Sequence, residues 1–133
     1  MFFGKRDCIE QIGYVSLWIG KFSTSEELEK YLLVAYTEDG DAIPSQFEKD
    51  FKVDYFDEDF SEAHYANQDM RKLSHLLKGC SYDGVVIPNF VEKYGEYLPD
   101  GFNSMILIYD FQHNKKSDNE INGVKYLGSI RYG

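Results

Sequence analysis

The sequence lacks the features on which small secreted and metal-stabilised domains depend. Cys8 and Cys80 are its only cysteines, and they form neither a CxxC motif nor a disulfide-dense spacing. Isolated cysteines of this kind are typical of a reducing compartment, where a buried thiol behaves as a small apolar side chain. Residues 1–10 carry charges at the positions where a signal peptide needs its apolar stretch. We therefore expect a cytoplasmic protein.

Long apolar runs and an excess of positive charge are also missing. No stretch approaches the roughly eighteen apolar residues that a membrane-spanning helix needs. Twenty-three acidic residues against fourteen basic ones give a net charge of −9. A field of that sign repels nucleic acids and anionic membranes and attracts basic partners. We therefore expect no direct binding to nucleic acid and no association with membranes.

Motifs for nucleotide binding, zinc binding and nucleophilic catalysis are absent. The sequence has no GxxxxGK[ST], GxGxxG or HExxH motif and no paired-cysteine zinc pattern. His64, His75 and His113 lie among polar neighbours, without a nucleophile elbow or a cysteine-protease signature. A pairing of Cys80 with His75 stays open, because the sequence alone does not show how far apart the two side chains lie. We predict no catalytic residue and no cofactor, and the alternative is a small enzyme with a carboxylate or Cys–His site.

The spacing of the acidic residues excludes an EF-hand calcium loop. Such a loop needs glycine at its sixth position and glutamate at its twelfth. Counted from Asp39 or Asp57 the sixth residue is not glycine, and counted from Asp118 the twelfth is not glutamate. We therefore predict no metal site.

The sequence does contain enough apolar material for a folded core. Its 133 residues are 43% hydrophobic and 17% aromatic, with eleven tyrosines and ten phenylalanines. A chain of this length buries a core without help from metals or disulfides. We expect one domain over residues 1–133, in which residues 1–12 form an N-terminal segment of unassigned structure.

Hydrophobic periodicity predicts four strands and four helices. Strands are expected at residues 13–22, 53–56, 104–111 and 124–132, and helices at residues 23–36, 45–51, 70–78 and 85–94. The resulting order is β-α-α-β-α-α-β-β. Because the strands are not regularly alternated with crossover helices, an α+β fold with a mainly antiparallel sheet is favoured over a doubly wound one.

Local signals mark where these elements begin and end. Capping-box pairs open the first two helices, namely Thr24 with Glu27 or the pair one residue earlier, and Ser45 with Glu48. Pro88 is expected in the first turn of the fourth helix.

Two turns are expected near the C-terminus, a Pro-Asp-Gly turn at residues 99–101 and a hairpin turn at Asn122-Gly123. We expect the strand at residues 104–111 to be central, with the strand at residues 124–132 beside it. The apolar residues Val124, Tyr126, Ile130 and Tyr132 are expected on one side of that last strand.

The most unusual part of the sequence is an acidic window at residues 38–62, which holds ten carboxylates and two lysines. Clustered like charges destabilise a free fold and steer a basic partner, and interleaved rings supply apolar anchors. We predict that this window is a partner-binding face, with these candidate residues: Glu38, Asp39, Asp41, Tyr55, Phe56, Asp57, Glu58, Asp59 and Glu62. Phe47, Phe51 and Phe60 are further rings among the charges. The alternative is a solvated surface that keeps the protein soluble.

Several blocks of the chain resemble a known family. In order, they are VSLWIGKF, SEELEKYL, YTEDGDAIPSQFEKDF, VDYFDEDFSEA, LLKGCSYDGVVIP, FNSMILIYDF and NGVKYLGSIRY. Together they span about residues 14–132 and resemble the immunity protein 22 family of bacterial polymorphic toxin systems. The resemblance implies a cytosolic antidote that is encoded beside a toxin, binds the toxin domain and protects the producing cell. It brings no catalytic or contact residues to this chain.

The resemblance and the acidic window suggest the same kind of partner. An inhibitor of a nuclease must block a basic, phosphate-binding cleft, and carboxylates can occupy such a cleft by mimicking the spacing of phosphates. We therefore expect a monomeric antidote to a cognate toxin with a basic surface, a nuclease being one candidate. An acidic protein-interaction domain unrelated to toxins is the other alternative.

Overall fold

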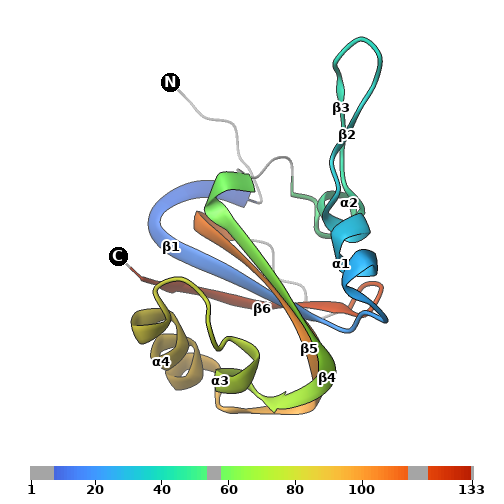
Figure 1. Cartoon of the computed structure of the whole chain (residues 1–133). Helices are drawn as coiled ribbons and strands as arrows, with labels where there is room; N and C mark the ends of the chain where they lie inside the picture. Colours follow the sequence, from blue (N-terminus) through green and yellow to red (C-terminus); the bar gives the residue numbers. More distant parts are fainter. Residues whose placement is uncertain (1–7, 54–57, 114–119, 133) are drawn as a thin grey trace.

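The computed structural model describes residues 8–53, 58–113 and 120–132 and shows an antiparallel sheet with helices on both faces (Figure 1). In spatial order the four strands of the sheet are β4 (Ser61–Lys72), β5 (Tyr97–His113), β1 (Cys8–Gly20) and β6 (Val124–Arg131). The other elements are α1 (Ser25–Leu32), β2 (Ala35–Tyr36), β3 (Ala42–Ile43), α2 (Gln46–Phe51), η1 (Glu58–Phe60), α3 (Leu73–Leu76) and α4 (Asp83–Tyr94). The predicted α+β class with an antiparallel sheet and four helices is confirmed.

Residues 15–20 of β1 are buried and contribute side chains to both faces of the sheet, as the apolar residues on both sides predicted. It lies between β5 and β6 and pairs antiparallel with each of them. Leu17 and Ile19 face α3 and α4, whereas Trp18 faces α1 and α2. The alternation along a strand sends neighbouring side chains to opposite faces, so a two-sided core draws apolar residues from both sets of alternating positions.

The two faces of the sheet have different cores. The core under α3 and α4 is mainly aliphatic, built from leucines, valines and isoleucines around Phe90. The core under α1 and α2 is aromatic, with the ring centroids of Phe47 and Tyr126 each 4.9 Å from that of Trp18. Truncation of such a buried ring typically costs about 3–5 kcal/mol. Helices α1 and α2 are therefore held to the sheet by large rings.

Helices α1 and α2 are both capped at predicted residues, and the predicted capping box is complete in α2. The Thr24 side chain accepts a hydrogen bond from the Glu27 backbone N–H at 3.2 Å, and Ser45 with Glu48 forms the full capping box. Helix α1 ends at Leu32, before the predicted residue 36, because the chain continues there into β2.

The largest difference between the predicted and the observed elements is at β4. The sequence showed a helix at residues 70–78, but Met70 and Lys72 pair with β5, and only residues 73–76 are helical. Strand β4 is an edge strand with irregular pairing to β5 and alternates poorly between apolar and polar residues. Its sequence therefore gave no period-two signal. The strand predicted at residues 53–56 lies outside the described residues except for Val53, which is not in a strand.

Two predictions that were made from prolines are wrong. Helix α4 begins at Asp83, which puts Pro88 at its sixth residue instead of in its first turn. Residues 99–101 are not a turn but part of β5, within a stretch of irregular pairing to β4. Proline is tolerated in such a strand where the ladder is interrupted.

The Asn122-Gly123 turn is confirmed, and its two positive φ angles, 53° and 79°, are those of a type I′ turn. However, β6 pairs with β1 and not with β5, so its predicted position beside β5 is wrong. A turn signal fixes local geometry only. The strand predicted to be central, now part of β5, is an inner strand of the sheet, and so is β1, which carries β6 at its other side.

The prediction that the apolar residues of β6 all lie on one side of the strand is wrong as well. Leu17 pairs with Gly128 and Trp18 with Tyr126, so β6 carries one extra residue, Leu127, at a bulge. The bulge reverses the alternation, and Ile130 packs on the face opposite to Val124 and Tyr126.

Candidate functional site

The structure divides the acidic window into parts with different roles. The hairpin of β2 and β3 carries Glu38, Asp39 and Asp41, whereas Asp59 lies in η1 and Glu62 in β4. Tyr55, Phe56 and Asp57 lie outside the described residues, and so does the side chain of Glu58.

Two interleaved rings are not available to a partner. Phe47 and Phe51 are 0% and 3% exposed and pack against Trp18 in the aromatic core. Their spacing of one helical turn, which faces the sheet, explains their burial. Phe60, by contrast, is exposed at η1.

The hairpin is shaped by a tight turn at its tip. The Gly40 N–H donates to the Thr37 carbonyl at 3.0 Å, and the Asp41 N–H donates to the Thr37 hydroxyl oxygen at 3.1 Å. Gly40 has a φ of 89°, a left-handed conformation that glycine adopts without strain. This geometry sets Glu38 and Asp39 at the apex.

The hairpin also exposes apolar side chains. Leu33, Tyr36 and Ile43 are 63%, 67% and 42% exposed, and every residue from 35 to 44 is exposed. Figure 1 shows the hairpin extending away from the sheet and its helices. These three residues were missed from the sequence, because two-residue strands are too short to show an alternation; the Asp-Gly turn between them was the available signal.

The base of the hairpin is tied to the sheet through Asp50. Its carboxylate accepts hydrogen bonds from the Tyr31 hydroxyl at 3.0 Å, the Gln46 amide at 2.7 Å and the Asn122 amide at 2.8 Å. Burial, together with this carboxylate, raises the pKa of Tyr31 above its ordinary value, so its hydroxyl stays protonated and donates. Asp50 thus links α1, α2 and the turn before β6.

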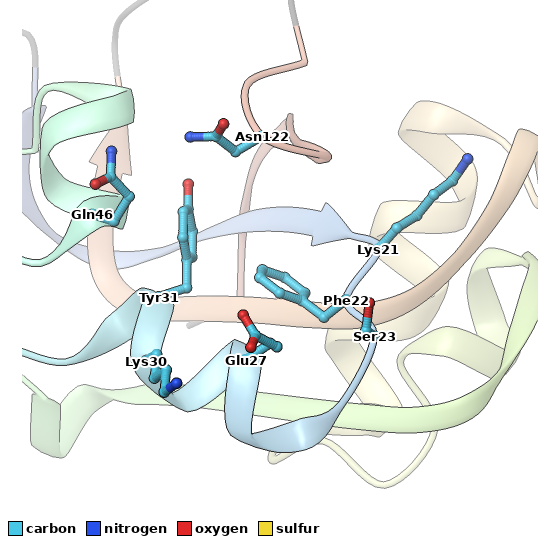
Figure 2. A pocket seen from close by; sticks show the side chains of 8 residues that line it. All are labelled: Lys21, Phe22, Ser23, Glu27, Lys30, Tyr31, Gln46 and Asn122. Carbon is cyan, nitrogen blue, oxygen red and sulfur yellow. The ribbon is translucent and has the colours of Figure 1, made fainter.

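A shallow cavity of about 380 Å³ lies beside this link (Figure 2). Its lining residues are Lys21, Phe22, Ser23, Glu27, Lys30, Tyr31, Gln46 and Asn122. Figure 2 shows the Tyr31 and Phe22 rings as neighbours beside α1, with the amides of Gln46 and Asn122 near the Tyr31 hydroxyl. The cavity joins two aromatic rings with two lysines, one carboxylate and three neutral polar side chains.

At the other end of the acidic window, the Glu62 carboxylate is hydrogen-bonded to residues of its own chain. The Glu62 carboxylate accepts hydrogen bonds from the Tyr109 hydroxyl at 2.7 Å and from the Ser81 N–H at 3.0 Å, and lies 3.3 Å from the His64 ring. Burial opposes ionisation of this carboxyl, but the hydrogen bonds from Tyr109, Ser81 and His64 outweigh it and hold the pKa of Glu62 below its usual value. Glu62 therefore fastens β4 to β5 and to the loop before α4.

The described residues thus include one projecting acidic hairpin, formed by β2 and β3. The profile of the Immunity protein 22 family matches residues 15–133. The chain belongs to this family. No curated protein and no solved structure matched it. Membership supports an immunity-type function, with a toxin as partner and the role of a non-enzymatic inhibitor.

The Cys–His alternative finds no support in this immunity protein. Cys80 is buried, whereas His75 is exposed. Burial and the nearby Glu62 and Asp83 carboxylates raise the pKa of the Cys80 thiol to about 11. A nucleophilic cysteine needs the opposite, a lowered pKa and access.

Among the described residues, no group of three or more histidine, cysteine and carboxylate side chains is arranged to hold a metal ion. Within the same ranges, no helix has the length and apolar character needed to cross a membrane.

Proposed function

We propose that this chain is an immunity protein that binds a cognate bacterial toxin domain and neutralises it by covering its active site with an acidic surface that carries exposed rings. The observation that carries the proposal is the hairpin, where Glu38, Asp39 and Asp41 lie beside the exposed ring of Tyr36. Family membership supports a toxin as the partner.

The two kinds of side chain have different roles in this proposal. Exposed charge pairs each contribute well under about 1 kcal/mol, so the carboxylates mainly speed encounter and exclude acidic partners. Affinity comes from apolar groups buried in the complex, and a central ring is commonly worth about 2 kcal/mol or more. Tyr36 is the described ring best placed for this, and Tyr55 and Phe56 stay candidates from the sequence.

The partner's chemistry follows from the charge. A protein with a net charge of −9 and three carboxylates on a projecting hairpin fits a toxin whose active-site region is basic. The phosphate-binding cleft of a nuclease is one such region. We propose that the antidote acts as a monomer in the cytoplasm, with residues 1–133 as one immunity unit and Asp57, Glu58 and Asp59 adding to the same field.

The experiment is a neutralisation assay with the neighbouring gene. The proposal predicts that the neighbouring gene encodes a large secreted protein, and reading that gene is the first step. The C-terminal domain of that protein is then expressed in bacteria with and without the antidote. We expect growth arrest by the domain alone, rescue by coexpression, and a stable complex on size-exclusion chromatography. A toxin domain that kills equally well with the antidote present would refute the proposed function.

A further inference from the structure

Among the described residues, no further strand pairs with the β2–β3 hairpin. A two-stranded hairpin is marginally stable by itself in water, because it has too little apolar surface to bury. Here all residues from 35 to 44 are exposed, and Leu33, Tyr36 and Ile43 present apolar surface to solvent. Burial of that surface against a partner would return about 25 cal/mol for each Å² removed from water.

Apolar side chains lie on both faces of this ribbon. Ala35 pairs with Ile43, and Tyr36 pairs with Ala42. Side chains of paired residues share a face and those of adjacent residues take opposite faces, so Tyr36 and Ile43 lie on opposite faces. A partner with a flat surface would cover only one of them. A cleft covers both, because its two walls enclose the ribbon.

The charges at the tip determine what the cleft holds. Between residues 31 and 47 the sequence has three carboxylates, Glu38, Asp39 and Asp41, and no lysine or arginine. Among the described residues, none of these carboxylates forms an ion pair, so desolvating them is costly unless cations of a partner meet them. The complementary surface is a cleft with apolar walls and lysine or arginine side chains at its floor.

The base of the hairpin is already ordered. Its first leg leaves α1 next to Tyr31 and its second leg enters α2 through the buried Ser45 cap, while Asp50 links both helices to the sheet. Fixed legs limit the directions in which the ribbon points and reduce the entropy lost on docking.

From these observations we infer that residues 33–44 form a recognition arm that inserts, tip first, into a cleft of the toxin domain, with a basic floor beneath Glu38 and Asp39 and an apolar wall against each face. The inference rests on the proposed function, and it goes further by naming the inserting segment and the shape and chemistry of the surface that receives it.

The test compares single substitutions on the two faces of the arm. Tyr36→Ser removes the anchor of one face and Ile43→Ser that of the other, and the matched control is Tyr97→Ser, since Tyr97 is 74% exposed and lies on the sheet. The probe is the C-terminal domain tested in the neutralisation assay, inactivated by mutation, and the dissociation constant is measured by calorimetry. We expect each arm variant to bind at least about tenfold more weakly, and the control to bind within about twofold of wild type.

Each outcome decides between specific alternatives. Loss of affinity on both faces, with unchanged melting temperatures, supports insertion into a cleft. Loss on one face only overturns the cleft, because it shows docking against a flat surface. Wild-type affinity in both variants overturns the recognition arm while the neutralising function stands. If wild-type protein does not bind the probe, the proposed function itself fails, and the inference fails with it.

Discussion

The two ends of the acidic window use the same chemistry in opposite ways. At the hairpin, Glu38, Asp39 and Asp41 point into solvent from a ribbon whose hydrogen bonds stay within itself. At β4, the Glu62 carboxylate is bonded to Tyr109 and Ser81 of its own fold. Charge density in a sequence therefore does not show whether a carboxylate contacts a partner or its own chain. The hydrogen-bond partners of the carboxylate in the structure show this.

The difference follows from what each end is attached to. Glu62 lies on a strand paired to the central β5, where leaving a half-buried carboxylate unpaired would be costly. The hairpin contributes nothing to either core, so its carboxylates stay hydrated without penalty. Substitution of Glu62 is therefore expected to affect stability, and substitutions in the hairpin are expected to affect binding.

The largest expected effect comes from removing the hairpin. Ala35 and Ile43 are paired, so a two- or three-residue linker can replace residues 35–43 across the roughly 5 Å between their backbones. We expect affinity for the toxin domain to fall at least about 100-fold, because two apolar anchors are lost together. The melting temperature should change little, since no core residue is removed. A large drop in melting temperature would show that the hairpin stabilises the fold, which would contradict its assignment to binding alone.

The second effect, at the other end, is on stability. Glu62→Gln should lower the free energy of unfolding by about 1–2 kcal/mol at pH 7, because hydrogen bonds to a charged group are lost. Since the fold lowers the pKa of Glu62, its stabilisation is present above the unfolded pKa of about 4.3 and disappears as the pH falls through the lower folded value. Urea unfolding at pH 7 and below pH 4 measures this, with Glu29→Gln, an exposed carboxylate on α1, as control. A difference that persists at low pH would contradict the assignment.

A smaller effect is expected from the charges of the hairpin alone. Glu38→Lys with Asp39→Lys should slow association with the toxin domain about fivefold at low salt, and the difference should shrink above about 0.5 M salt, where charges are screened. The control is Asp83→Lys with Glu92→Lys, which makes the same change of charge on exposed residues of α4. Stopped-flow fluorescence gives both rates. Equal slowing in the two variants would mean that net charge matters and position does not.

The smallest effect concerns the thiol near Glu62. Cys80 should react with iodoacetamide at pH 8 far more slowly than a free thiol, because its pKa is raised to about 11 and its side chain is buried. Mass spectrometry of the native and urea-unfolded protein provides the comparison. Rapid labelling of the native protein would revive the Cys–His alternative.

Much of the fold was predictable from local patterns. The apolar faces of β1, the Ser45 capping box and the Asn122-Gly123 turn are set by nearby residues, and all three are present. Strand β4 was not predictable, because an irregularly paired edge strand loses its alternation. The neighbour of β6 was not predictable either, since strand order is decided by long-range packing.

The candidate site was only partly predictable for the same reason. The three hairpin carboxylates were found from charge density, but Leu33, Tyr36 and Ile43 were not, because exposure depends on what the rest of the chain fails to cover. Phe47 and Phe51 resembled surface anchors in the sequence and proved to be core. Interleaving with charges is compatible with either role in an amphipathic helix.

The central claim, that the hairpin is the surface which meets the toxin, is tested most directly by amide hydrogen exchange in the free protein and in its complex with the inactivated toxin domain. The backbone N–H groups of Thr37, Gly40 and Asp41 lie in the exposed tip and should exchange rapidly in the free protein. In the complex we expect their exchange to slow at least about tenfold, while amides of β4 near Glu62 keep their rates. Unchanged exchange at the tip, with new protection elsewhere on the surface, would contradict the account.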